Sequence, residues 1–365
     1  MKLNIVILRN SFYCFIVLII LVNTSCSSND GDYAEVPQSP VVLDLEQVPY
    51  PKLSDYHFFE GELKQQAPSI GVIPFAPKST LFTDYAKKKR FIWLPEGEIA
   101  TYNGDHDVIE LPTGAALVKT FYYDNVQPAN DTRIIETRIM IRKPEGWIFA
   151  EYVWNEEQTD AFLTTQGGTT DISWLENGVA KSTTYQIPNI LDCFTCHHRG
   201  TEVLPIGIKP QNLNFNYSYA DGSKNQLQKW IDVGYLEDDL PAEIASVVDY
   251  SDTSKSLDLR VRSYLDINCA HCHRDGGEAE FYVMRFAFSG TIDPANLGIC
   301  MEPNHVVPGF SGSIVKPGDI SKSMLHYRMN TVDPIYRMPL LGRTMKHQEG
   351  VDLVEQWINQ LAECP

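Results

Sequence analysis

The pattern Cys-x-x-Cys-His occurs twice in this chain of 365 residues, and it constrains the fold more than any other feature. The two copies read Cys193-Phe-Thr-Cys196-His197 and, 76 residues further on, Cys269-Ala-His-Cys272-His273. Two thiols at this spacing can form thioether bonds to the vinyl groups of a haem, and the histidine that follows can bind the iron from one face. The motifs therefore predict two covalently bound haem c groups.

Other uses of paired cysteines fit this pattern less well. A zinc ribbon separates its pairs by about 15–20 residues, far fewer than here. A thioredoxin-like redox pair lies in a βαβ unit, and neither motif has one around it. Two short disulfides would leave His197 and His273 without a role. These alternatives are weaker than haem attachment, which uses every residue of both motifs.

The first 25 residues differ in kind from the rest of the chain. Lys2 and Arg9 precede an apolar run over residues 12–22. A run of about 11 apolar residues is shorter than the roughly 20 that a membrane-spanning helix needs. Residues 1–25 are therefore expected to be a secretory leader, so that the protein works outside the cytoplasm.

Cys26 follows this leader where a bacterial lipoprotein signal places its lipidated cysteine. Asn23 stands where that signal usually has Leu, so a plain leader cut nearby and an uncleaved anchor stay open as alternatives. The polar stretch that follows predicts a flexible tether over 26–44. We expect a lipoprotein held at a membrane, in the periplasm or on the outer-membrane surface.

Cys300 and Cys364 are the two cysteines that remain once the motifs, the leader and the lipid site are assigned. In an oxidising compartment an even remainder favours a disulfide, which would tie the loop 297–303 to the C-terminus. Two separate thiols are the alternative.

The formal net charge of the chain is −17. Such a protein repels polyanions, which argues against nucleic acid or an anionic bilayer as the main partner. A redox partner protein with a basic surface fits better, and the membrane is reached through the expected lipid anchor. The one cationic cluster, Lys87-Lys88-Lys89-Arg90, can steer a ligand, although a solvated face is the commoner role of such a run.

Residues 45–185 are expected to form a β-rich, sandwich-like or barrel-like domain. The stretches 116–123 and 134–142 alternate apolar with polar residues, and a Pro-Glu-Gly turn leads from the second into 147–154 as a hairpin. Alternate residues of a strand share one face. The residues expected together on one face are Ile135, Thr137, Ile139 and Ile141.

Two smaller, mainly helical segments follow. Residues 186–251 contain the first motif and a helix expected to begin at Ser223 and to stop before Gly234. Residues 252–365 contain a helix that leads into the second motif and another near the C-terminus, the layout of a class I cytochrome c domain. The expected fold class is therefore α+β with several domains: a β-rich domain, then two small, mainly α haem-binding units, the last cytochrome c-like.

Met338 is expected to be the sixth ligand of the second haem. It lies in Arg-Met-Pro-Leu-Leu-Gly, 65 residues after His273 and just before the terminal helix. A thioether opposite an imidazole is the ligand pair of many low-spin electron-transfer haems. Met324 and Met329 compete by residue type, and we expect them to pack around the haem; a core role for Met338 is the alternative.

Two further expectations concern the second motif. Gly276 and Gly277 would let the backbone pass close to the haem, so that a carbonyl accepts the second N–H of His273. His271 points away from the iron and is expected at the surface or beside a haem propionate.

The sixth ligand of the first haem is not determined by the sequence. No Met or His lies between His198 and Tyr250, so this ligand comes from another segment or is absent. The candidates by residue type are His57, His106, Met140, Met284, Met301, His305, His326 and His347.

Several short stretches within residues 45–361 carry a resemblance to a known family. They are Leu-Phe-Thr-Asp-Tyr-Ala86, Phe-Ile-Trp-Leu-Pro95, Leu-Pro-Thr-Gly-Ala115, Lys-Thr-Phe-Tyr-Tyr123, Ile-Glu-Thr-Arg138, Tyr-Val-Trp-Asn-Glu156, Tyr-Leu-Asp-Ile-Asn-Cys-Ala-His-Cys-His273, Lys-Pro-Gly-Asp319 and Arg-Met-Pro-Leu-Leu-Gly342. In these stretches the chain resembles a bacterial family of dihaem c-type cytochromes with an N-terminal β domain. The resemblance implies haem at both motifs, electron transfer, and Met338 as a distal ligand; it supplies no substrate.

We therefore expect a dihaem cytochrome that carries electrons between a donor dehydrogenase and an acceptor outside the cytoplasm, with no catalytic residues of its own. The alternative is a peroxidase-like or oxidase-like enzyme, in which the first haem keeps an open coordination site and the second supplies electrons. A β domain that binds a partner or polymer, served by the haems, is a third class. A six-coordinate, low-spin first haem would favour the carrier.

Overall fold

The computed structural model describes residues 38–305 and 307–364, and Ser39–Pro365 form one compact unit. The leader expected over 1–25 and the lipidation expected at Cys26 lie outside the described residues. Within the described part of the chain, no helix is both long and apolar enough to cross a membrane. The boundaries expected inside the compact unit, after residues 185 and 251, stay predictions.

The compact unit begins earlier than we expected from the sequence. Residues 39–44 were assigned to the tether, but Val41 and Leu43 pack on an apolar cluster that contains Tyr56, and the Val42 N–H donates to the Tyr56 carbonyl at 3.0 Å. The reason is that Val41, Leu43 and Leu45 are apolar and that all three side chains pack on this cluster.

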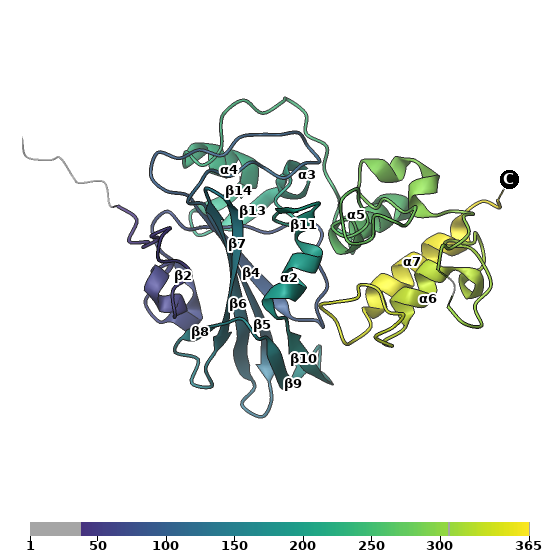
Figure 1. Ribbon diagram of the computed structural model, residues 1–365, viewed down its shortest axis with the longest axis horizontal. Helices are drawn as coiled ribbons and strands as arrows, with labels where there is room; N and C mark the ends of the chain where they lie inside the picture. The colour runs from purple at the N-terminus through teal and green to yellow at the C-terminus, as the bar shows by residue number, and fades with distance from the viewer. Residues whose placement is uncertain (1–37, 306, 365) are drawn as a thin grey trace, which may run out of the picture. The chain divides into compact units, whose positions relative to one another are not determined.

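An eight-stranded antiparallel sheet forms the centre of the unit (Figure 1). Its strands are β3 (Ile73–Pro74), β4 (Lys87–Trp93), β5 (Ala116–Val126), β6 (Asp131–Lys143), β7 (Gly146–Trp154), β8 (Ala161–Thr164), β9 (Gly168–Glu176) and β10 (Val179–Ile187). The main path runs β10-β9-β5-β6-β7-β8, while β4 pairs with β5 and with β3. The β-rich region and the expected hairpin, β6 with β7, are confirmed.

The two faces of the sheet have different coverings. One face packs against the segment that precedes the sheet, through a cluster that includes Phe91, Val118, Ile139 and Ile141. The other face is covered by later segments of the chain and carries the polar side chains discussed below. Ile135 belongs to this second side, where it packs with Tyr123 and Trp174.

The expected grouping of Ile135 with Thr137, Ile139 and Ile141 is therefore wrong for its first member. Phe121 pairs with Glu136 but Tyr122 pairs with Ile134, so the register shifts at this point and Ile135 is the extra residue. A β-bulge of this kind reverses the facing of every residue beyond it.

Short elements surround the sheet. Before it come 3₁₀ turns at Leu53–Tyr56 and Leu63–Gln65 and the strands β1 (Phe59–Glu60) and β2 (Ala67–Pro68). After it come α2 (Ile190–Cys196), β11 (His198–Arg199), β12 (Glu202–Val203), α3 (Pro210–Leu213), β13 (Asn216–Tyr219), β14 (Gly222–Asn225) and α4 (Gln226–Asp232). The cap of α4 is Asn225 rather than the expected Ser223, because Ser223 is in the ladder of β14 and Asn225 accepts from the Leu227 N–H.

The C-terminal part is helical. It contains α5 (Leu257–Cys269), α6 (Met324–Asn330) and α7 (Gln348–Gln360), with 3₁₀ turns at Gly290–Ile292, Pro294–Leu297 and Ile320–Lys322. Figure 1 shows α6 and α7 together on the side of the unit away from the N-terminal segment. The apolar faces of α5 and α7 form one cluster, with Val261 and Leu265 from the first and Val354 and Ile358 from the second. Both helices were expected from the apolar spacing.

Candidate functional site

The first Cys-x-x-Cys-His motif is held by a short, well-capped helix. The side chain of Asn189 accepts from the N–H groups of Leu191 and Asp192 at 2.8 and 3.1 Å, and Asp192 accepts from the Asn189 N–H at 3.0 Å. This capping box fixes the start of α2. Because Cys193 and Cys196 are three residues apart on a helix, their thiols lie on the same face.

His197 ends this helix in the form that an iron ligand requires. Its Nδ1 lies 3.0 Å from the Leu204 carbonyl, so the proton is on Nδ1 and the Nε2 lone pair is available. Its ring also meets the ring of Phe149 edge-on, with 5.4 Å between the centroids. Burial, followed by the charge of Lys119, lowers the pKa of His197 to about 3, so the imidazole is neutral at physiological pH.

The second motif follows the C-terminal end of α5. Burial lowers the pKa of His273 to about 4, and the ring packs against Phe286 at 5.1 Å between centroids. Its Nδ1 is buried and, among the described residues, has no hydrogen-bond partner. The expected carbonyl contact at the two glycines is therefore wrong. A Cβ at Gly277 would lie 2.4 Å from the Cys272 carbonyl oxygen, which explains that glycine instead.

The two motifs, far apart in the sequence, meet in the structure. The Gly200 N–H donates to the Gly276 carbonyl at 2.7 Å, and the Arg274 guanidinium donates to the His198 carbonyl at 2.7 Å. A Cβ at Gly276 would lie 2.9 Å from the Gly200 nitrogen, so only glycine permits this approach. The loops that follow the two motifs are thus joined backbone to backbone.

Side chains of the two motifs also come together. One donor atom from each of Cys196, His271 and Cys272 lies within 4.8 Å of the other two. Three such atoms can also bind zinc, which prefers thiolates. A structural zinc site has four protein ligands, and among the described residues this group offers three. Neither Cys193 nor Cys269 belongs to the group.

A cavity of about 280 Å³ opens beside the first motif, between the sheet and the loop that contains Met338. Cys193, Cys196 and His197 line it, and so do Arg337 and Pro339 on either side of Met338. Apolar lining is contributed by Phe75, Leu117, Val118, Phe121, Phe149, Ile208 and Ile267. Two thiols, a free Nε2 and apolar walls on one cavity are what a covalently attached haem needs, so the residues present fit this group.

The cavity distinguishes among the eight candidates for the sixth ligand of the first haem. Met140 is the one of them that lines it. Met140 lies on β6 opposite Phe149, the residue that contacts the ring of His197. Among the other candidates, His106 lines a separate cavity of about 180 Å³, and His326 lies 3.5 Å from Glu355.

Met338 is half-buried, and its N–H donates to the Arg328 carbonyl at 2.9 Å. Met329, which we expected beside the haem, packs in the cluster between α5 and α7. Met324 is also buried. The assignment of Met338 to the second iron stays a prediction. His271, expected at the surface or near a propionate, is half-buried and lines both cavities.

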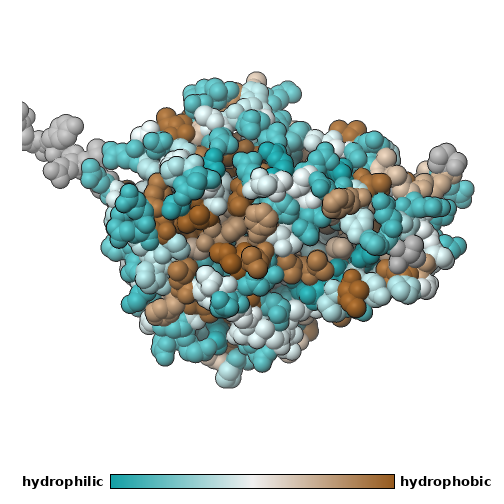
Figure 2. Space-filling model, in the orientation of Figure 1, coloured by the Kyte–Doolittle hydropathy of each residue, from teal (hydrophilic) through white to brown (hydrophobic). Residues whose placement is uncertain are grey.

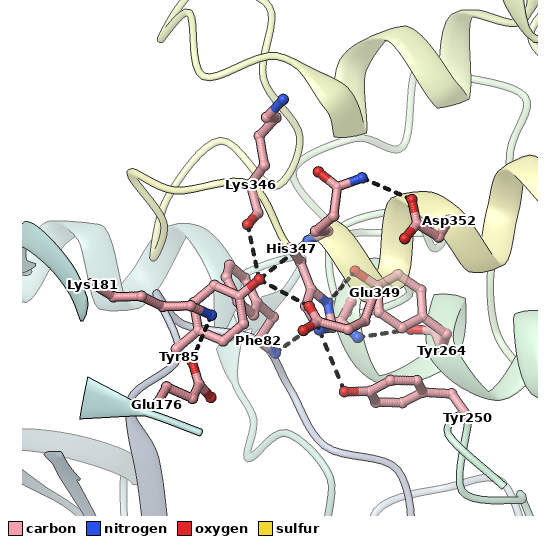
Figure 3. A network of polar contacts seen from close by, with 12 residues as sticks. Phe82, Tyr85, Glu176, Lys181, Tyr250, Tyr264, Lys346, His347, Glu349 and Asp352 are labelled. Atoms are coloured by element: carbon pink, nitrogen blue, oxygen red, sulfur yellow. Dashed lines mark hydrogen bonds and ion pairs between the residues drawn. The ribbon is translucent and has the colours of Figure 1, made fainter. Parts of the chain in front are cut away.

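The segment Leu81–Ala86, one of the stretches that carry the resemblance, docks on the loop and helix after Met338 (Figure 3). The Asp84 carboxylate, only 2% exposed, accepts from the Thr344 N–H, the Thr344 hydroxyl and the Met345 N–H, all at 2.8 Å. The Phe82 ring stacks on His347 at 4.2 Å. This role of Asp84 was not found from the sequence, where a single acidic residue gave no signal.

His347 is the centre of a further group of aromatic contacts in Figure 3. Its Nδ1 lies 3.0 Å from the Tyr264 hydroxyl and its Nε2 lies 3.4 Å from the Tyr250 hydroxyl. The Tyr85 hydroxyl donates to the Glu349 carboxylate at 2.9 Å, and Lys181 lies 3.6 Å above the Tyr85 ring. Both ring nitrogens of His347 thus have a hydroxyl partner, and His347 does not line the cavity beside the first motif.

The structure joins Cys300 to Cys364 by a disulfide bond, with 5.8 Å between their Cα atoms. The bond lies between the loop after Leu297 and the end of the chain, so it closes the C-terminal part around α7. The four motif cysteines form no disulfide bond among the described residues.

Comparisons of this chain with protein-family models, with curated proteins and with solved structures gave no match. Its function is therefore argued from its own motifs and from the geometry described above.

Proposed function

We propose that the chain is a dihaem c-type cytochrome that carries electrons outside the cytoplasm, held at a membrane by a lipid on Cys26. The observation that carries the proposal is the meeting of the two motifs through the Gly200–Gly276 hydrogen bond, each motif with a neutral imidazole. Haem, when bound, supplies a one-electron redox couple. Two adjoining attachment loops would keep two such groups at a short, fixed separation.

In this proposal the chain orients and insulates its cofactors. Leu204 holds the His197 ring with Nε2 toward the cavity, and the sheet wall excludes water from one side. Met140 is the proposed sixth ligand at the first site, and Met338 at the second. Methionine ligation raises the reduction potential relative to a second histidine, which suits transfer to an oxidising acceptor.

Apolar residues around the first motif give a place for partner contact. Figure 2 shows hydrophobic residues in the middle of the face on which Figure 1 places α2. On this helix Leu191 is 76% exposed, and Ile190 and Phe194 are also exposed. An apolar patch on a chain of net charge −17 fits a redox partner with a basic rim.

The direct test is haem content. The full chain, produced in a bacterium that attaches haem c, should have the mass of two haems beyond the mature polypeptide. Its EPR spectrum should show two low-spin irons. Replacing Cys193 and Cys196 by Ala should remove one haem. The matched control is the double change Cys300→Ala and Cys364→Ala, which removes two cysteines and should keep both haems. A wild-type mass with no added porphyrin would refute the proposal.

One observation favours the enzyme as a second candidate. The cavity that His197 faces also has Arg138 and Lys119 on its wall, and such cations can stabilise negative charge on a small oxidant. If Met140 does not bind the iron, the first haem keeps an open position. A high-spin signal that changes when cyanide is added would then favour the peroxidase-like enzyme.

A further inference from the structure

Four charged residues form a row across four neighbouring strands. Arg90 on β4 lies opposite Lys119 on β5, Lys119 lies opposite Arg138 on β6, and Arg138 lies opposite Glu151 on β7. We call these four residues the charged row. All of them line the cavity beside the first motif. The expectation that the cluster 87–90 is a solvated face is therefore wrong for Arg90, because strand alternation points every second residue to the inner face.

The charges of this row are not balanced within the chain. Arg138 has a carboxylate partner, since its guanidinium donates to Glu136, which also accepts from the Tyr185 hydroxyl at 2.6 Å. Burial and the neighbouring Glu136 raise the pKa of Glu151 to about 10, so Glu151 is neutral at physiological pH. Among the described residues, Glu136 is thus the one carboxylate that pairs with a basic residue of the charged row.

Arg90 and Lys119 have no carboxylate of their own. Among the described residues, neither side chain makes an ion pair or a hydrogen bond, and Lys119 rests on the Phe121 ring at 4.8 Å. Burial lowers the pKa of Arg90 to about 10 and holds that of Lys119 well below its usual value. Arg90 and Lys119 are half-buried basic side chains without partners, and a charge in such a position is costly unless an anion neutralises it.

The opposite wall of the cavity is cationic too. Arg337 and Arg343 line it from the loop that contains Met338. Arg343 donates to the carbonyls of Arg328 and Thr331, and its buried Nε has no partner among the described residues. Among the residues that the structure describes, the acidic side chains on the lining are Glu151 and Asp192, the latter engaged in the cap of α2. Because the chain has a net charge of −17, most of its surface repels anions, and an anion would bind in this cation-rich cavity rather than elsewhere.

We infer that Arg90 and Lys119, with Arg138 beside them, form a binding site for an anion with carboxylate-like oxygens. A planar guanidinium and an ammonium side by side suit two oxygens of such a group. Two sources share this chemistry: a propionate of the haem attached at the first motif, or a free small carboxylate or oxyanion that enters the cavity. The first source rests on the proposed function, and the second does not.

The variants Arg90→Gln and Lys119→Gln test the site, with Lys87→Gln as the matched control. Lys87 carries the same charge on the same strand, but it pairs with Asp124 outside the cavity. Two measurements are made on each holo-protein: the midpoint potential of each haem, and calorimetric titration with sodium acetate and with sodium sulfate. Arg90→Lys keeps the charge and shows whether anion binding depends on the charge or on the planar shape of the guanidinium. A thermal melt of each variant shows that it is folded.

The two sources give different results. If a propionate fills the site, wild-type protein binds neither added anion, while each Gln variant shifts the midpoint potential of one haem and Lys87→Gln does not. If a free anion fills it, wild-type protein binds acetate or sulfate, and each Gln variant binds about tenfold more weakly or worse. Variants that match Lys87→Gln in both measurements would overturn the inference.

The outcome stays separate from that of the proposed function. Should the purified chain carry no haem, the same titrations are made on the haem-free protein. Anion binding weakened by Arg90→Gln but not by Lys87→Gln would then support the site although the cytochrome proposal has failed. Absence of any anion binding in that protein would overturn the site as well.

Discussion

Replacement of Asp84 by Ala is expected to loosen the junction between the sheet and the loop that contains Met338. The buried Asp84 carboxylate accepts three hydrogen bonds, from both donors of Thr344 and from the Met345 N–H. Hydrogen bonds to a charged group contribute about 1.5–3 kcal/mol each, and bonds that share one acceptor group are not additive. The change should therefore lower the free energy of unfolding by about 3–5 kcal/mol.

Asp84 has a second, separable contribution. Its φ is 44°, and that of Tyr85 is 63°, so two successive residues are in the left-handed region. Asn is tolerated in this region better than Ala. The left-handed backbone should therefore lower the free energy of unfolding of Asp84→Ala by about 1 kcal/mol more than that of Asp84→Asn. Asp84→Asn keeps the backbone preference and one acceptor, so it should lose less stability than Asp84→Ala. The loss of stability in Asp84→Asn measures mainly the contribution of the charge, and the further loss in Asp84→Ala measures the backbone preference together with the remaining acceptor.

Urea unfolding followed by tryptophan fluorescence gives the free energies, and a redox titration gives the functional effect. A looser loop should place Met338 at its iron for less of the time, which lowers the potential of one haem. Glu98→Ala is the control, because Glu98 is exposed. If Asp84→Ala unfolds within about 0.5 kcal/mol of that control, the network does not hold the loop and the reasoning is refuted.

Four further outcomes are expected. Met338→Ala should lower the potential of one haem only, and an unchanged redox titration would remove it as a ligand. Met140→Ala should convert the first haem from low to high spin, whereas an unaltered EPR spectrum would show that another group binds there. Burial lowers the folded-state pKa of His347 to about 4, so its contribution to stability is present above about pH 6.5 and is lost as pH falls through 4. In urea titrations, the free energy of unfolding of His347→Phe should therefore fall by about 2–3 kcal/mol less than that of the wild type over this pH range. A non-reduced digest should contain a Cys300–Cys364 cross-linked peptide, and its absence by mass spectrometry would contradict the bond in the structure.

Much of the local structure followed from periodicity. The β6–β7 hairpin, α5 and α7 were predicted because their apolar residues recur at a period of two or of about 3.6, and they are present. The errors fall where a local event interrupts the period. The bulge at Ile135 and the cap at Asn225 each depend on how the strand register ends, which a run of residue types does not record.

The candidate site divides in the same way. The sequence alone was enough to select Cys193, Cys196 and His197, because the proposed thioether attachment and iron ligation require those residue types in a fixed local spacing. Asp84, Lys119 and Arg138 could not be selected in this way, since a charged residue in a turn or on a strand is unremarkable until the element beside it is known.

The sequence by itself determined the proposal of haem attachment, because that chemistry depends on neighbours along the chain. Tertiary structure alone decided that the two motifs touch through Gly200 and Gly276, and that Met140 shares a cavity with His197. It also decided that Arg90 lies in a row of basic residues across neighbouring strands, and that this row ends at Glu151. These are contacts between residues tens of positions apart, and their geometry is set by strand register and by the packing of loops on the sheet, which no local pattern encodes.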